Sequence, residues 1–208
     1  MLLEDISAQL QKGKAKAVKE LVQQAIDEGI PAQKILTEGL LSGMNIIGEK
    51  FKKNEIFVPE VLVAARAMNQ GTSLLKPLLA AEGSVSLGKV IIGTVAGDLH
   101  DIGKNLVGMM LEGSGFTVMD LGVDVKPEMF IDAVRGGAKI IGMSALLTTT
   151  MPMMAKVIER LKDEGLRDQV KVMIGGAPIT QEYADEIGAD GYSSDAASAA
   201  ELAKRLIA

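Results

Sequence analysis

The two halves of the chain differ in the spacing of their apolar residues. Over the first ~80 residues, apolar positions recur every three or four residues, which is the period of an amphipathic helix. The pattern predicts helices at about residues 3–10, 14–27, 31–51 and 59–79. The last of these carries one continuous apolar stripe, made of Val58, Val61, Ala65, Met68, Thr72, Leu75 and Leu79. Four helices with short connections indicate a small four-helix bundle.

From residue 89 onward, short β-rich apolar runs alternate with helical stretches. The expected strands are 89–96, 116–121, 140–145, 170–174 and 191–193, and the expected helices are 101–112, 127–134, 152–164, 180–187 and 196–206. Such alternation is typical of an α/β fold with a parallel sheet covered on both faces. The length suits a flavodoxin-like or Rossmann-like sheet of five strands in the order 2-1-3-4-5.

A small, polar and glycine-containing stretch at residues 80–88 (AEGSVSLG after Ala80) separates the two halves. Such a composition is typical of a linker. We therefore predict two domains, a helical-bundle domain over residues 1–85 and an α/β domain over residues 86–208.

Composition narrows the classes of function. The chain has 208 residues, no cysteine and a net charge of −5, and aromatic residues make up 3%. The lack of cysteine excludes disulfides, iron–sulfur clusters and thiolate zinc sites. Acidic charge and scarce aromatics argue against a nucleic-acid surface. No apolar run approaches the ~20 residues of a membrane span, and the N-terminus lacks the pattern of a signal peptide. We expect a cytoplasmic protein.

Three loops of the predicted sheet carry the candidate chemistry. In a sheet of this order, ligands bind beyond the carboxyl ends of the strands, next to the first strand. The loop there, residues 97–103, reads GDLHDIG and holds His100, the single histidine of the chain. The loop after the third strand is rich in hydroxyl groups, and Gly175-Gly176 follows the fourth. We expect these loops to converge on one rim, together with the polar loop at residues 192–195 (YSSD) after the fifth strand.

An imidazole beside a carboxylate suits a metal ligand. An aspartate that accepts one ring N–H fixes the tautomer and leaves the other nitrogen free for a metal. Asp98 and Asp101 both flank His100, and either could instead cap the following helix. We expect Asp101 to do so and Asp98 not to. The glycines could serve packing or a turn, and the threonines could cap a helix.

Other chemistries lack their motifs. No G-x-G-x-x-G follows the first strand and no P-loop is present. No second histidine exists to complete a zinc site.

These residues resemble a known family. Residues 98–103 resemble the D-x-H-x-x-G signature of cobalamin-binding domains, residues 144–146 (SAL) resemble their S-x-L motif, and Gly175-Gly176 their glycine pair. In the helical half, residues 48–51 (GEKF), 57–61 (FVPEV) and 64–68 (AARAM) look like the cap domain of methionine synthase and of corrinoid proteins from anaerobes. The resemblance covers nearly the whole chain, and its two-module build is similar to the free-standing corrinoid methyl carriers.

The resemblance implies roles for individual residues. His100 would be the lower cobalt ligand in place of the cofactor's own base, and Asp98 would accept its other N–H. Thr150 would end this relay, at a position where methionine synthase has serine. The full set that the resemblance places at the cofactor is Asp98, His100, Asp101, Gly103, Ser144, Leu146, Thr148, Thr150, Gly175, Gly176, Phe51 and Val58.

Some members of this set belong to other parts of the cofactor. Ser144 and Thr148 match positions that face the displaced nucleotide tail, and Gly175 and Gly176 match the floor of its pocket. Phe51 and Val58 match cap residues over the upper, methyl-bearing face, with Val61 as a third. None of these residues is expected to be catalytic, because the chemistry belongs to the cofactor.

The implied function is that of a methyl carrier. By the resemblance, its cobalt cycles between Co(I) and methyl-Co(III). It accepts a methyl group from a substrate-specific methyltransferase and hands it to a second one with a tetrahydrofolate-type or thiol-type acceptor. A corrinoid-reactivating reductase is a further expected partner, and the linker at residues 80–88 is the expected hinge.

Three alternatives remain open at this point. They are a subunit of an adenosylcobalamin-dependent isomerase, a cobalamin-based sensor, and a flavodoxin-like domain without a corrinoid. The sequence does not encode the methyl donor, which methanol, methylamines, glycine betaine or aryl methyl ethers could each supply.

Overall fold

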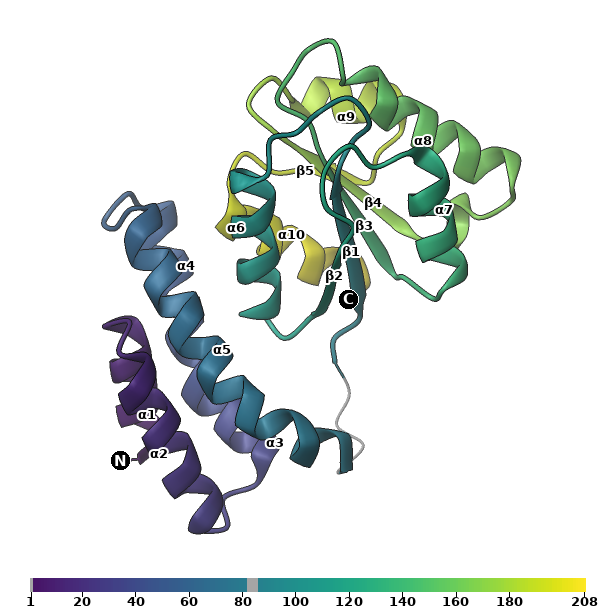
Figure 1. The fold of residues 1–208 in the computed structure, drawn as a ribbon. Coiled ribbons are helices and arrows are strands. Elements are labelled where there is room, and N and C mark those ends of the chain that lie inside the picture. The colour runs from purple at the N-terminus through teal and green to yellow at the C-terminus, as the bar shows by residue number, and fades with distance from the viewer. Residues whose placement is uncertain (1, 82–85) are drawn as a thin grey trace. The chain divides into compact units, whose positions relative to one another are not determined.

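The structure is a computed structural model that describes residues 2–81 and 86–208. The chain divides into two compact units, a helical unit and a sheet unit that begins at Ser86, and Figure 1 shows the elements of each. The predicted linker at residues 80–88 includes residues 82–85, which lie outside the described residues. No helix in the described ranges is long and apolar enough to cross a bilayer.

The helical unit contains the four predicted helical segments. Its elements are α1 (Leu2–Gln11), α2 (Ala15–Asp27), α3 (Ala32–Lys34), the π-helix η1 (Ile35–Leu41), α4 (Ser42–Lys52) and α5 (Val58–Ala81). On α5, the middle of the predicted stripe is buried in the unit, with Val61 and Leu75 both 0% exposed. Burial of this stripe against the other helices supplies most of the stability that isolated helices lack.

The predicted helix at residues 31–51 is one helical segment, but its middle is a π-helix rather than an α-helix. A Cβ added to Gly39 would lie 3.2 Å from the side chain of Ile6, and one added to Gly43 would lie 3.0 Å from the carbonyl oxygen of Ser7. The two glycines therefore allow α1 to approach this segment closely. Apolar periodicity does not distinguish a π-helix from an α-helix over so short a stretch.

The sheet unit contains five parallel strands in the predicted order, β2-β1-β3-β4-β5. Its elements are β1 (Lys89–Thr94), α6 (Ile102–Glu112), β2 (Thr117–Asp120), α7 (Pro127–Arg135), β3 (Ile140–Ser144), α8 (Pro152–Asp163), the 3-10 helix η2 (Arg167–Gln169), β4 (Lys171–Gly175), α9 (Gln181–Ile187), β5 (Gly191–Tyr192) and α10 (Ala196–Ile207). Predicted and observed ends agree within two residues. The predicted fold class is confirmed.

Helices cover both faces of this sheet. Helices α7, α8 and α9 pack on one face, where Phe130, Val157 and Ala184 join the strand residues Ile91 and Ile141 in one buried cluster. Helices α6 and α10 pack against each other and against the strands from the other face (Figure 1). Strand β1 is buried from Val90 to Thr94, so the loop that follows it starts from a fixed, central strand.

The register of the three central strands aligns their carboxyl ends. Thr94 of β1 pairs with Ser144 of β3, and Ser144 pairs with Gly175 of β4. The loops that follow these three residues therefore leave the sheet side by side. They are the three loops in which the sequence placed the candidate chemistry.

Candidate functional site

A tight turn at the end of β1 positions the histidine loop. The backbone N–H of Asp98 donates to the carbonyl of Val95 over 3.1 Å, and Gly97 has a left-handed φ of 83° that suits glycine in such a turn. The hydroxyl of Thr94, a residue 0% exposed, donates to the carbonyl oxygen of His100 over 2.8 Å. The loop is thus tied back to the strand that it leaves.

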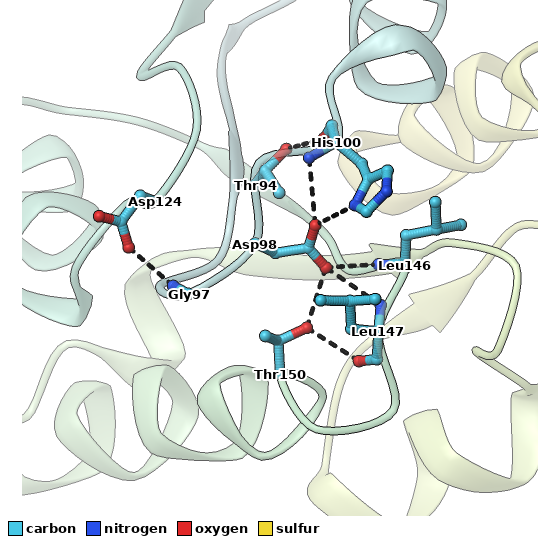
Figure 2. Close-up of polar contacts among 8 residues, drawn as sticks. All are labelled: Thr94, Gly97, Asp98, His100, Asp124, Leu146, Leu147 and Thr150. Carbon is cyan, nitrogen blue, oxygen red and sulfur yellow. Dashed lines mark hydrogen bonds and ion pairs between the residues drawn. The ribbon is translucent and has the colours of Figure 1, made fainter.

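Asp98 and His100 form a close pair at this turn (Figure 2). Oxygen Oδ1 of Asp98 lies 2.7 Å from Nδ1 of His100 and also accepts the backbone N–H of His100 over 3.1 Å. The Asp98 side chain is 0% exposed, whereas the His100 side chain is 52% exposed. Within the described part of the chain, Nε2 of His100 has no hydrogen-bond partner. A buried carboxylate therefore holds a ring whose other nitrogen remains accessible.

The second carboxylate oxygen of Asp98 binds the loop after β3. Oδ2 accepts from the backbone N–H groups of Leu146 at 2.8 Å and Leu147 at 3.1 Å, and from the hydroxyl of Thr150 at 2.9 Å. Figure 2 shows these donors gathered on one side of the carboxylate. One aspartate thus joins the loops of two adjacent strands.

These bonds determine the charge of Asp98 and the tautomer of His100. Burial by itself would raise the pKa of Asp98, but hydrogen bonds from Leu146, from the ring and backbone of His100, and from Leu147 outweigh it and hold the pKa well below its usual range. An ionised carboxylate can only accept hydrogen bonds. The proton of neutral His100 therefore resides on Nδ1, and Nε2 presents a lone pair, which is the form of histidine that binds metals.

Asp101 has a different environment from Asp98. It directly precedes α6, its carbonyl accepts the backbone N–H of Asn105, and its carboxylate accepts the side-chain amide of Asn105 over 3.2 Å. Asp98 contacts the histidine and the β3 loop instead of capping α6, as expected. The hydrogen bond of the Asp101 carboxylate is to a side-chain amide, and among the described residues no backbone N–H of α6 donates to it, so the expected cap is not observed.

Large apolar side chains lie exposed along the same two loops. The exposed fractions are 71% for Leu99, 78% for Ile102, 41% for Leu146 and 42% for Leu147. Of these, Leu146 alone is among the predicted cofactor-binding residues. Leu99, between Asp98 and His100, and Ile102, between Asp101 and Gly103, could have been found from their polar or glycine neighbours, because a large apolar side chain at such a position has no obvious core to enter. Apolar groups gathered around a binding residue indicate a partner with an apolar surface.

The glycines in the predicted motifs differ in whether the structure requires the absence of a side chain. A Cβ added to Gly103 would meet nothing within 4 Å, so packing within the described chain does not require this glycine. At Gly176 φ is 136° and an added Cβ would lie 1.8 Å from the carbonyl oxygen of Ala145, so the backbone itself excludes any other residue. For Gly175 the nearest atom, the carbonyl oxygen of Ser193, would lie 3.2 Å away. Gly103 thus leaves room for a ligand to approach.

The remaining predicted residues occupy two places. Ser144 ends β3 and Thr148 lies exposed in the loop beyond it, on the same edge of the sheet as His100. Phe51 in α4 and Val58 at the start of α5 belong to the helical unit, where both are partly buried. Val61 lies in the core of that unit. The roles of these residues toward a cofactor stay predictions.

A metal at His100 would have few ligands from the protein. Among the described residues, no group of three or more His, Cys, Asp or Glu side chains is arranged to hold a metal ion. The carboxylate of Asp98 accepts from five donors, so the exposed imidazole of His100 is the candidate ligand of this pair. Most coordination positions of a metal bound there would be left for groups outside the protein, as in a metal-carrying cofactor.

Comparison with known proteins identifies the class. Residues 88–201 match the family described as B12 binding domain, and residues 2–76 match a second family of the same description. The chain belongs to the family of B12-binding corrinoid proteins.

Two relatives match over the whole length. A corrinoid protein of Desulfitobacterium hafniense (strain Y51) is 44% identical, with 99% of this chain and 97% of the relative covered. Dimethylamine corrinoid protein 1 of Methanosarcina acetivorans is 46% identical, with 100% of this chain and 98% of the relative covered. Among solved structures, the methanol:cobalamin methyltransferase complex of Methanosarcina barkeri matches with a TM-score of 0.88 and 30% identity, covering 99% of this chain and 79% of that one.

Proposed function

We propose that this protein is a corrinoid methyl carrier in which His100 is the lower ligand of the cobalt. The observation that carries the ligand assignment is the Asp98–His100 pair. A buried, ionised carboxylate fixes the only imidazole of the chain in the Nδ1–H tautomer and leaves Nε2 accessible. The methyl-carrier function is supported by the family and by the names of the relatives, which include dimethylamine corrinoid proteins.

The site fits a corrinoid better than a bare metal ion. A corrinoid would bring most of the cobalt ligands with it, so the single imidazole of His100 would be a sufficient ligand from the protein. The exposed side chains of Leu99, Ile102 and Leu146 would pack under such a macrocycle, where burial of their apolar surface contributes to binding. Gly103 offers the open space that an approaching ring needs.

The chain's own residues hold and tune the cofactor. When bound, the corrinoid supplies the cobalt that accepts and donates the methyl group. His100 would hold the cobalt through Nε2, and Asp98 keeps the proton of the ring at Nδ1. Thr150, through its bond to Asp98, steadies the carboxylate. None of these residues performs a chemical step on the methyl group, so the protein acts as a carrier subunit.

The remaining assignments follow from the resemblance. Residues 1–85 would be the cap domain that shields the upper face, with Phe51 and Val58 above the cobalt, and residues 86–208 would be the cobalamin-binding domain. The partners are methyltransferases. We assign one to the methyl donor and one to a tetrahydrofolate-type or thiol-type acceptor, with a reductase that restores the reduced cobalt. The cytoplasmic location stays a prediction.

Reconstitution with hydroxocobalamin tests the ligand assignment. The wild-type protein is expected to turn coloured and to show the spectrum of cobalt with a histidine lower ligand. His100→Gly should lose that spectrum, and added free imidazole should restore it, because imidazole can enter the space left by the side chain. Thr149→Ala, an exposed neighbour in the β3 loop, is the control and should match wild type. A spectrum unaffected by His100→Gly would rule out the ligand role.

Methyl transfer tests the carrier function. The methylated protein is mixed with purified donor and acceptor methyltransferases, and the cobalt spectrum is followed. Dimethylamine is the first donor to test, because the relatives in Methanosarcina bear its name. Demethylation by an acceptor enzyme and remethylation by a donor enzyme are the expected results. The carrier function would be contradicted if no methyltransferase, whatever its methyl donor, transferred a methyl group to or from the cobalt.

A further inference from the structure

We propose that Asp124 is a positioning residue for the Asp98–His100 pair. This inference rests on the proposed role of His100 and deepens it. Asp124 lies outside the three sequence motifs, in the loop that follows β2. Its carboxylate and its backbone together hold the turn from which Asp98 projects.

Two hydrogen bonds make this clamp. Oxygen Oδ1 of Asp124 accepts the backbone N–H of Gly97 over 2.7 Å, and the backbone N–H of Asp124 donates to the carbonyl of Asp98 over 3.0 Å. One bond lies before the Cα of Asp98 and the other lies after it. Figure 2 shows the carboxylate of Asp124 directed at Gly97. The direction in which the Asp98 side chain leaves the backbone is therefore fixed on both sides.

The β2 loop is held beside the turn by further backbone bonds. Thr94 donates its N–H to the carbonyl of Gly122 over 3.0 Å and accepts the N–H of Val125 over 2.9 Å. These bonds continue the pairing beyond the end of β2. Because β1 lies between β2 and β3 in the sheet, the Asp98 turn is held from the β2 side by Asp124 and from the β3 side by Leu146, Leu147 and Thr150.

The backbone at Asp124 is unusual in a way that matches this role. Its φ is 52°, and among the described residues the one other non-glycine residue with positive φ is Asn54. Aspartate and asparagine tolerate this left-handed conformation better than other residues with a Cβ. Strained backbone positions of this kind persist where surrounding bonds over-determine them. Here the two bonds to the Asp98 turn do so.

A comparison of wild type with two variants of Asp124 distinguishes the effect of its carboxylate from that of its backbone conformation. Asp124→Gly keeps the left-handed backbone without strain, because glycine adopts positive φ freely, but it removes the acceptor for Gly97. Asp124→Asn keeps both the backbone conformation and an oxygen acceptor. If Asp124 positions the pair, the glycine variant loses the fixed His100 tautomer and part of the cofactor affinity, and the asparagine variant retains both. If the negative charge itself is needed, the asparagine variant is as impaired as the glycine variant.

The first measurement needs no cofactor. His100 is the single histidine, so its two ring nitrogens give an unambiguous 15N NMR signature in full-length protein that carries no histidine tag. The Nδ1–H tautomer should dominate in wild type and in Asp124→Asn, and the Asp124→Gly protein should show a mixture of both tautomers. Thermal unfolding of each protein verifies that the fold is retained.

The second measurement is the affinity for hydroxocobalamin. Loss of a residue that orients a metal-binding histidine typically lowers metal affinity 10-fold or more, so about a tenfold loss is expected for Asp124→Gly. Asp124→Asn should bind like wild type. A glycine variant with wild-type tautomer and affinity would overturn the proposal, and so would an asparagine variant as impaired as the glycine variant. A wild-type protein that binds no hydroxocobalamin, yet follows the expected tautomer series, would instead reject the proposed function and leave the role of Asp124 intact.

Discussion

The hydroxyl of Thr150 donates a hydrogen bond of 2.9 Å to the carboxylate of Asp98, 52 residues earlier in the chain. The same hydroxyl oxygen lies 2.8 Å from the carbonyl oxygen of Leu147. Because the hydroxyl has one hydrogen, it either divides that hydrogen between the two acceptors or alternates between them. Thr150 thus couples the carboxylate that holds His100 to the turn that precedes α8.

Removing this hydroxyl should weaken the fold and loosen the histidine. Thr150 is 7% exposed, so Thr150→Val retains the shape and deletes one charge-assisted hydrogen bond, for an expected loss of about 1.5 kcal/mol in the free energy of unfolding. Thr150→Ser keeps the hydroxyl and should preserve the Nδ1–H tautomer of His100. Denaturant unfolding and 15N NMR provide the measurements. The exposed neighbour variant Thr149→Val should change neither quantity, and a serine variant that behaves like the valine variant would contradict the role of the hydroxyl.

Stability should depend on pH through Asp98. Its pKa is lower in the folded protein than in the unfolded chain, so the unfolded chain binds more protons in acid. The stabilisation is therefore complete above the ordinary carboxyl pKa of about 4 and declines as the pH falls below it. Asp98→Asn places an amide N–H₂ or a weaker acceptor against donor groups, which should cost about 2 kcal/mol at neutral pH.

A comparison of wild type with Asp98→Asn isolates the contribution of Asp98 to the pH dependence of stability. Asp195, which caps α10, also has a lowered pKa, because hydrogen bonds from Ser198 and Ser194 outweigh the effect of its burial. The loss of stability of the wild-type protein in acid therefore includes contributions from both carboxylates. The difference in unfolding free energy between wild type and Asp98→Asn, measured from pH 7 to pH 3, should be constant at first and shrink in acid. A difference that grows as the pH falls would refute the assignment.

A buried lysine near the site gives a prediction about stability alone. Lys104 in α6 is paired with Asp120 at the end of β2, and their side chains are 3% and 40% exposed. Asp120→Ala leaves a buried ammonium without its counter-charge, with the side-chain oxygen of Asn105 as its remaining partner, and should cost about 3 kcal/mol. Lys104→Met leaves a carboxylate that water can solvate and should cost about 1 kcal/mol.

The order of these two values is the test, because burial alone would rank the lysine as the more important residue. Urea unfolding measures both. Arg135→Met removes two ion pairs, with Asp132 and with Glu164, of an arginine that is 55% exposed, and this surface control should cost no more than about 0.5 kcal/mol for each pair. A larger cost for Lys104→Met than for Asp120→Ala would contradict the reasoning from desolvation.

The cap assignment leads to a prediction about protection of the methyl group. If Phe51 covers the upper face, Phe51→Ala opens a path for water and oxygen to the methylated cofactor. Loss of the methyl group under light or air, followed by absorption, should be faster than in wild type. Equal rates would mean that another side chain provides the cover.

Much of the fold follows from local patterns. The alternation of β-rich runs with helical stretches predicts all five strands, and the length of this half favours the flavodoxin-like strand order 2-1-3-4-5. The π-helix at Ile35–Leu41 could not be predicted, because apolar periodicity over seven residues does not distinguish it from an α-helix.

The sequence by itself determined which residue is the candidate ligand. His100 is the single histidine, and it stands in the loop after the strand beside which this strand order binds ligands. Both facts are local, so they can be read without coordinates. Only the tertiary structure decided how that histidine is held. Asp98 meets Leu146, Leu147 and Thr150 because β1 and β3 are neighbours in register, and it meets Asp124 because β2 lies on the other side. Hydrogen bonds between loops so far apart in sequence form only once the strands that carry these loops are paired in register.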